Sequence, residues 1–376
     1  MNPGIIFFEA LIYSSLATKN LLSQYFDISG FSPTKIGILM AVLPAVSLVS
    51  SPLWFKLSGK FGYDKIYYIV SLSSALLIWP IFVVKSFTTT LFMMILLSFF
   101  FSAVVPLGDS IIINKLKSSG GRFDRVRLFG TIGFAITSLA LSRLVGLSFF
   151  WLFAASAAVL VISSLFISPK TDDLETADQQ HLSGTGSTFQ LTMMTVGMFV
   201  GVTLNSFHNT FIAVYARENG MDSSVVGMVF AITALSEIPF LLFADRIIEK
   251  IGNMKILLFG MIVMGVRMIL ISYATNEVLL YLVEFSHGLT YILMYYSLYH
   301  FIHYELSGKS LVKAESLFWV VRSGMTFIVG SIGGGIVIDL LSVTFAFRFF
   351  GFVGVVSSVV MIIFYIVISR RKNALI

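Results

Sequence analysis

Hydrophobic residues recur along the whole chain in long runs that are separated by short polar stretches. Runs of about twenty apolar residues match the roughly 30 Å hydrocarbon core of a bilayer, because an α-helix rises about 1.5 Å per residue. They are too long and too continuous for barrel strands, which alternate apolar and polar residues over about ten positions. The pattern therefore predicts an all-α integral membrane protein surrounded by the lipid bilayer.

Twelve such runs each predict one transmembrane helix. They cover residues 5–26, 35–57, 66–85, 90–114, 126–146, 148–168, 189–216, 224–244, 254–274, 277–304, 313–338 and 343–369. If both termini are cytoplasmic, the 25 Lys and Arg divide into 17 inside, 5 outside and 3 within helices. Because Lys and Arg favour cytoplasmic loops, this bias predicts a multi-pass protein of the cell (inner) membrane with both termini in the cytoplasm.

A polar stretch divides the predicted helices into two groups of six. Residues 169–188 contain acids, Gly, Ser and Thr without apolar periodicity, which is typical of a flexible linker. The predicted organisation is an N-terminal half (1–168), a cytoplasmic linker (169–188) and a C-terminal half (189–376).

The two halves resemble each other at an offset of 190 residues. Residues 25–37 read YFDISGFSPTKIG, and residues 215–227 read YARENGMDSSVVG. Three identities fall at this offset: Tyr25 with Tyr215, Gly30 with Gly220, and Gly37 with Gly227. Identities at one offset, in the same place of each half, favour an internal duplication over repetitive loop chemistry.

Composition excludes several other classes of protein. The chain is 57% apolar and 12% charged, against roughly 45–50% and 25% in soluble domains. The net charge of +6 follows from the cytoplasmic loops, so no nucleic-acid partner is expected. The chain has no cysteine, which excludes disulfides, Cys-based metal sites and thiol nucleophiles.

Motifs for enzymes and pumps are weak in this sequence. Residues 333–335 are three glycines without the Lys-Ser/Thr of a phosphate-binding loop, so an ATP-driven pump is not expected. His300, His303 and Glu305 are too few for a convincing metal site. We therefore expect no enzyme, no cofactor and no metal.

Charged side chains inside the predicted helices carry the strongest functional signal. A charge at the bilayer centre costs about 2.5–3.5 kcal/mol even on insertion scales, so each one requires a partner or a use. The sharpest set lies on helices eight, nine and ten: Glu237, Arg267, Glu284 and His287. Glu284 and His287 are three residues apart and share one helix face. A carboxylate that is neutral in one state and paired with Arg in another suits proton coupling; a structural cluster is the alternative.

A second set of polar residues is predicted to bind substrate in a central cavity. Lys19 lies on the first helix, where it either faces this cavity, the interpretation we favour, or extends to the outer interface. Asn205, His208 and Asn209 interrupt the apolar run of the seventh helix, and the offset places Asn209 at the position of Lys19. Equivalent polar positions on helices one and seven indicate a shared cavity between the halves.

Asp109 and Arg127 lie on consecutive helices, four and five. Asp109 is near the middle of its helix and Arg127 near the start of the next, so their expected depths differ. We therefore predict that Asp109 is a cavity residue and that Arg127 is a gate or loop anchor.

The chain resembles the major facilitator superfamily in its six-plus-six helices, its polar linker and the GFSPTKIG stretch before helix two. That superfamily carries a G-x-x-x-D-R-x-G-type motif after helices two and eight. The motif is degenerate at residues 57–62, whereas Asp245 and Arg246 keep the acid–arginine pair, which implies a gating role for them. Residues 106–109 (PLGD), 127–134 (RLFGTIGF) and 236–239 (SEIP) are similar to the branch with lactose permease, nucleoside–proton symporters and phenylpropionate permeases.

The resemblance implies a secondary active transporter that works by alternating access. Lactose permease has a comparable Glu, Arg, His and Glu set on helices eight to ten, which implies proton coupling here; its helix-ten pair runs His before Glu, whereas Glu284 precedes His287. We predict a monomeric symporter of protons with a sugar, nucleoside or aromatic acid. A proton-driven exporter of drugs or sugars is the alternative, followed by a membrane sensor that does not transport.

Overall fold

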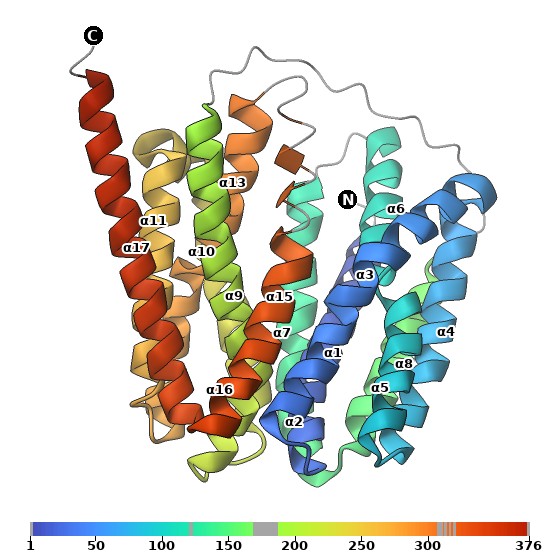
Figure 1. Ribbon diagram of the computed structural model, residues 1–376. Coiled ribbons are helices and arrows are strands. Elements are labelled where there is room, and N and C mark those ends of the chain that lie inside the picture. The colour runs from blue at the N-terminus through green and yellow to red at the C-terminus, as the bar shows by residue number, and fades with distance from the viewer. Residues whose placement is uncertain are drawn as a thin grey trace.

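The computed structural model describes residues 3–119, 123–167, 187–306 and 321–373, together with residues 311, 314, 315, 317 and 318. All regular elements in these ranges are helical, and each of the twelve predicted segments contains at least one helix. The predicted linker lies outside the described residues except for its last two positions, 187 and 188. Figure 1 shows the helices packed side by side in one bundle.

The helices that precede the predicted linker begin near their predicted starts. Pro33 and Phe87 begin helices directly after Ser32 and Ser86, which stay extended. Two predicted helices are interrupted, the first near Leu21 and the fourth near Ser102. The elements are α1 (Pro3–Asn20), α2 (Leu22–Ile28), α3 (Pro33–Phe61), α4 (Tyr63–Val83), α5 (Phe87–Phe101), α6 (Val104–Ser119), α7 (Phe123–Leu147) and α8 (Phe150–Leu165).

The helices after the predicted linker depart further from simple rods. The tenth predicted helix is broken by a 3-10 segment, and the eleventh contains two π-helical turns. The elements are α9 (Thr188–Glu218), α10 (Val225–Ile251), α11 (Asn253–Ile271), α12 (Glu277–Glu284), η1 (Phe285–Leu289), α13 (Tyr291–Glu305), η2 (Val321–Met325), α15 (Thr326–Ile328), η3 (Val329–Gly333), α16 (Gly334–Leu340) and α17 (Val343–Asn373).

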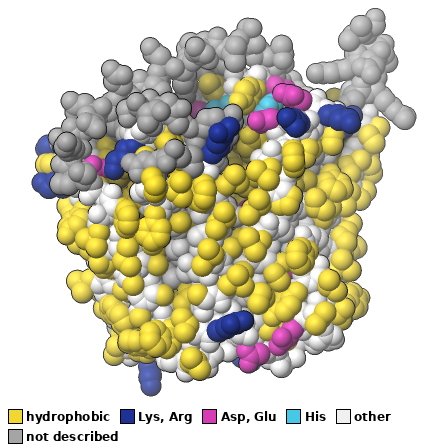
Figure 2. Space-filling view, turned by 180° about the vertical axis from the view of Figure 1, so that it is seen from behind, with side chains coloured by type: hydrophobic (Ala, Val, Ile, Leu, Met, Phe, Trp, Pro, Cys, Tyr) yellow, Lys and Arg dark blue, Asp and Glu magenta, His cyan; other side chains and the backbone are white. Residues whose placement is uncertain are grey.

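Apolar side chains dominate the outer surface of the bundle. Among the described residues, nine helices are long and apolar enough to cross a membrane, and shorter apolar helices lie at Phe150–Leu165 and Thr326–Leu340. Figure 2 shows hydrophobic side chains over the middle of one face, with Lys and Arg toward its two ends. Since lipid replaces water as the neighbour of this surface, the predicted all-α membrane fold is confirmed.

The backbone repeats the offset that the sequence shows. Four glycines of the described residues have a positive φ: Gly30 (83°), Gly62 (92°), Gly220 (69°) and Gly252 (92°). They form two pairs separated by 190 residues, and each follows a helix. Glycine is required there because other residues rarely adopt such φ values. Equivalent turns therefore have the same geometry in both parts of the chain.

The contacts between the two parts are tight at the end of the bundle opposite the predicted linker. A Cβ atom on Gly37 would collide with the Ser331 carbonyl oxygen, and one on Gly227 would lie 2.5 Å from that of Ser138. Arg217 Nε donates to Asp27 Oδ2 at 2.6 Å across the same interface. The bundle is therefore closed at this end.

Candidate functional site

Three polar side chains form the most deeply buried charged cluster of the described residues. His208 comes from α9, Arg267 from α11 and Glu284 from the last position of α12. His208 Nε2 lies 2.8 Å from Glu284 Oε1, while Arg267 Nη2 donates to Glu284 Oε2. All three side chains are 0% exposed. Burial of this kind requires mutual pairing, because an isolated ion in such a place is very costly.

The second ring nitrogen of His208 is also occupied. His208 Nδ1 lies 3.0 Å from Asn209 Oδ1, so both ring nitrogens face oxygen atoms. His208 Nε2 also lies 3.1 Å from Arg267 Nη2, so this one nitrogen contacts both members of the Arg267–Glu284 pair.

Glu237 and His287 form a second pair next to this cluster. His287 Nε2 lies 3.3 Å from Glu237 Oε1, and the two side chains are 8% and 18% exposed. The 3-10 segment η1 carries His287 and packs against α10, where a Cβ on Gly288 would collide with the Ser236 carbonyl oxygen. This close approach of the two backbones brings His287 to Glu237.

The predicted coupling residues are therefore divided between two contacts. Arg267 and Glu284 pair with each other, whereas Glu237 and His287 pair separately. His208, a predicted substrate-binding residue, contacts both Arg267 and Glu284. Sequence spacing could not reveal this, because the orientation of α9 toward α11 and α12 is set by packing. Asn205, one turn earlier on α9, is buried, and Asn209 is partly buried beside His208.

The first part of the chain contains a polar cluster that the sequence did not predict as a unit. Tyr13 Oη donates to Asp109 Oδ2 at 3.1 Å, and the Arg127 guanidinium lies 3.6 Å from the centre of the Tyr13 ring. Asp109 and Arg127, which were predicted at different depths, thus both contact Tyr13 through their side chains. Glu9, one turn before Tyr13, is fully buried close by.

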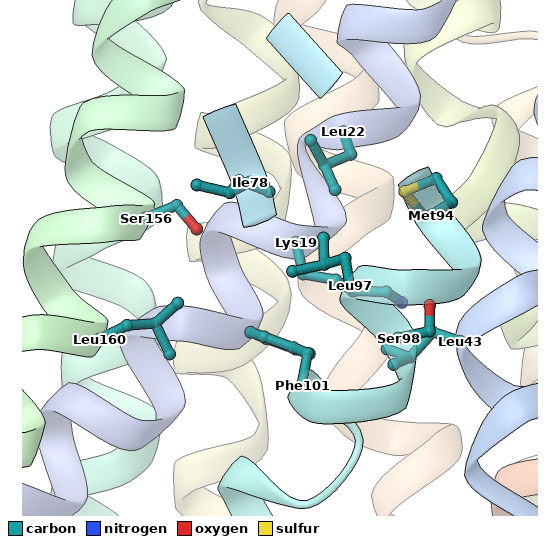
Figure 3. A pocket seen from close by; sticks show the side chains of 10 residues that line it. All are labelled: Lys19, Leu22, Leu43, Ile78, Met94, Leu97, Ser98, Phe101, Ser156 and Leu160. Atoms are coloured by element: carbon teal, nitrogen blue, oxygen red, sulfur yellow. The ribbon is translucent and has the colours of Figure 1, made fainter. Parts of the chain in front are cut away.

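Lys19 lines a cavity, but not one between helices one and seven. Lys19 extends into this cavity toward Ser98 (Figure 3). All its walls come from α1, α2, α3, α4, α5 and α8: Leu22, Leu43, Ile78, Met94, Leu97, Ser98, Phe101, Ser156 and Leu160. None of these wall residues comes from α9, which carries Asn209.

The predicted gating pair lies at the end of α10. Asp245 and Arg246 are exposed, and Tyr296 Oη of α13 donates to Asp245 Oδ1 at 2.8 Å. Nearby, His300 Nδ1 and Glu305 Oε1 both contact Asn253 Nδ2, while His303 Nε2 lies 3.2 Å from Glu315 Oε1. These contacts tie together the ends of α10, α11 and α13.

The fold is that of a helical membrane protein with ion pairs buried inside its bundle. The model of the MFS_1-like family matches residues 8–349, so the chain belongs to this family of the major facilitator superfamily. The resemblance predicted from the sequence motifs is thereby confirmed.

Particular relatives are permeases and transporters. The chain is 24% identical over 345 residues to the uncharacterized transporter YwbF of Bacillus subtilis, covering 89% of this chain and 86% of that protein. It is 26% identical over 281 residues to the maltose permease of Geobacillus stearothermophilus, covering 72% and 70%. The crystal structure of the nucleoside transporter NupG has the same fold, with a TM-score of 0.79, 19% identity and coverage of 97% and 99%.

Proposed function

We propose that this protein is a secondary active transporter that imports a small organic solute together with a proton by alternating access. The observation that carries the proposal is the fully buried contact of His208, Arg267 and Glu284, which lies beside the partly exposed Glu237–His287 pair. Ionisable groups inside membrane proteins are rare, pair with one another and mark ion and proton pathways.

Protonation of this cluster has a mechanical consequence. A proton added to Glu284 removes its negative charge and the attraction that holds Arg267 Nη2 at Oε2. Since the three side chains come from α9, α11 and α12, losing that attraction loosens three helices together. The partly exposed Glu237 is the group through which a proton reaches His287 and then the buried cluster.

Alternating access requires that one end of the bundle open while the other closes. In this structure the end opposite the predicted linker is closed by the Asp27–Arg217 pair and by the close contacts of Gly37 and Gly227. The two predicted six-helix halves move against each other around this interface, and the termini and linker stay on the cytoplasmic side of the inner membrane.

The relatives support transport of a small solute over catalysis. A maltose permease and a nucleoside permease are similar to this chain over most of their length. Sugars, nucleosides and aromatic acids are therefore the classes to screen, with the protein acting as a monomer and without a cofactor. A carrier of this size binds its solute between pre-formed polar groups and apolar walls.

Proton uptake by the reconstituted protein tests the proposal. Purified protein in vesicles is exposed to each solute class while the external pH is recorded. We expect alkalinisation with one class, and loss of that signal in Glu237→Gln. Glu249→Gln is the matched control, because Glu249 is an exposed carboxylate on the same helix. Transport without proton movement, unchanged in Glu237→Gln, would contradict coupling through Glu237.

A further inference from the structure

Lys19 lies inside the bundle and has no counter-ion among the described residues. Its nearest recorded partner is Asn20 Oδ1, at 3.5 Å, and no carboxylate of the described residues lies within 4 Å of its amine. Arg267, by contrast, is paired with Glu284, and Arg217 with Asp27. A cation held inside a membrane bundle without a counter-charge is costly unless an anion reaches it.

The cavity around Lys19 adds a second unsatisfied polar group. Ser98 is buried, and its hydroxyl has no hydrogen-bond partner in the described structure. Figure 3 shows the Lys19 side chain pointing toward this residue. An ammonium and a hydroxyl on one side of a cavity can both donate to the same pair of oxygen atoms.

The remaining walls define the other end of the ligand. Apart from Lys19, Ser98 and Ser156, they are Leu, Ile, Met and Phe side chains. The Ser156 hydroxyl already accepts from Thr18 Oγ1 at 3.1 Å. The cavity therefore has one polar end and an apolar body.

We propose that this cavity is a binding site for a small monocarboxylate with an apolar or aromatic body. The carboxylate accepts from Lys19 Nζ and Ser98 Oγ, while the hydrocarbon part packs against the leucine, isoleucine and phenylalanine walls. A phosphate ester fits less well, because the site offers a single cation and no arginine. The inference rests on the proposed function only in taking this ligand as the transported solute.

Binding to the purified full-length protein in detergent tests the site without requiring transport. Calorimetry with benzoate and benzamide compares a charged with an uncharged ligand of the same shape. We expect benzoate to bind at least tenfold more tightly than benzamide, and Lys19→Met to weaken benzoate roughly 10- to 100-fold, as for loss of a charge-assisted hydrogen bond. Ser98→Ala should weaken it roughly 2- to 10-fold.

Lys85→Met is the matched control, because it removes the same charge from an exposed position after α4 and should leave benzoate binding unchanged. Lys19→Arg keeps the charge and serves if Lys19→Met does not fold. Equal affinity for benzoate and benzamide, absence of benzoate binding to the unmodified protein, or unchanged binding in Lys19→Met would overturn the inference.

The outcomes separate this site from the transport proposal. Benzoate binding that depends on Lys19 but causes no proton uptake in vesicles supports the site and contradicts symport. Proton uptake driven by a nucleoside or sugar, with no benzoate binding, supports symport and contradicts the site.

Discussion

Residues 18–19 on α1 and 208–209 on α9 are equivalent by the 190-residue offset. Their surroundings differ, because charged partners surround His208 whereas Lys19 has no charged partner among the described residues. His208 and Asn209 belong to a cluster in which Glu284 contacts both His208 and Arg267. Lys19 faces a largely apolar cavity, and the hydroxyl of its neighbour Thr18 donates to the Ser15 carbonyl and to the Ser156 hydroxyl. At a duplicated position, the polar side chain can therefore find its partner within the protein in one copy and remain available to a ligand in the other.

Paired and unpaired charges inside the bundle differ in whether they serve stability or binding. Charges that pair inside the bundle hold helices together, and removing one partner leaves the other buried without compensation. A charge without a partner inside the bundle opposes folding but remains available to an anion. Three experiments test this difference between paired and unpaired charges, in order of decreasing expected change.

Replacing Arg267 with Met should have the strongest effect on stability. Glu284 would remain buried with only His208 beside it, and breaking such a pair costs about 3–5 kcal/mol. Unfolding titrations in detergent measure the change. Lys19→Met is the contrast and should not destabilise the protein, because it removes no ion pair and takes away a cation that has no counter-charge inside the bundle.

The double variant Arg267→Met with Glu284→Gln should recover part of the lost stability, since it removes the uncompensated charge. Equal destabilisation by Arg267→Met and Lys19→Met would show that the two positions do not differ in the way proposed.

The equivalent glycines at the closed end should respond alike. A methyl group on Gly37 or Gly227 would collide with the backbone of η3 or α7, and overpacking of this kind costs about 1–3 kcal/mol. We expect Gly37→Ala and Gly227→Ala each to open the end of the bundle opposite the predicted linker. Because the chain has no cysteine, a single Ser223→Cys reporter would be labelled faster in both variants.

Gly59→Ala serves as the control, because a methyl group there meets no atom within 4 Å. If only one of the two glycine variants opens the interface, the close contacts on the two sides are not equivalent.

The Asp27–Arg217 pair gives the smallest expected change. These residues are themselves separated by 190 positions, so the interface joins a residue to its own counterpart with opposite charge. Arg217 is half exposed, so Arg217→Gln should cost about 1 kcal/mol or less. Exchanging the charges in Asp27→Arg with Arg217→Asp should restore most of that loss, measured by the same unfolding titration. A double exchange no better than the single variant would argue against direct pairing.

The sequence predicted some of the candidate site and missed other parts for identifiable reasons. The Arg267–Glu284 pair was within reach because charged residues are rare in apolar runs and therefore seek each other. Tyr13 was missed because a tyrosine in an apolar helix carries no signal of its partners. Asp109 and Arg127 were placed apart because helix depth was counted along the backbone, whereas the arginine side chain spans the difference.

The sequence alone predicted that the chain lies in lipid, that it is all-α and that its two parts are related by a 190-residue offset. Apolar runs of bilayer length allow no other backbone structure than helices, and glycine at equivalent turns records φ values that other residues rarely adopt. Tertiary structure decided the breaks in the tenth and eleventh helices, the joining of His208 to Glu284 and the apolar cavity around Lys19. These depend on how each helix is rotated about its axis, and that rotation is set by packing among helices distant in sequence.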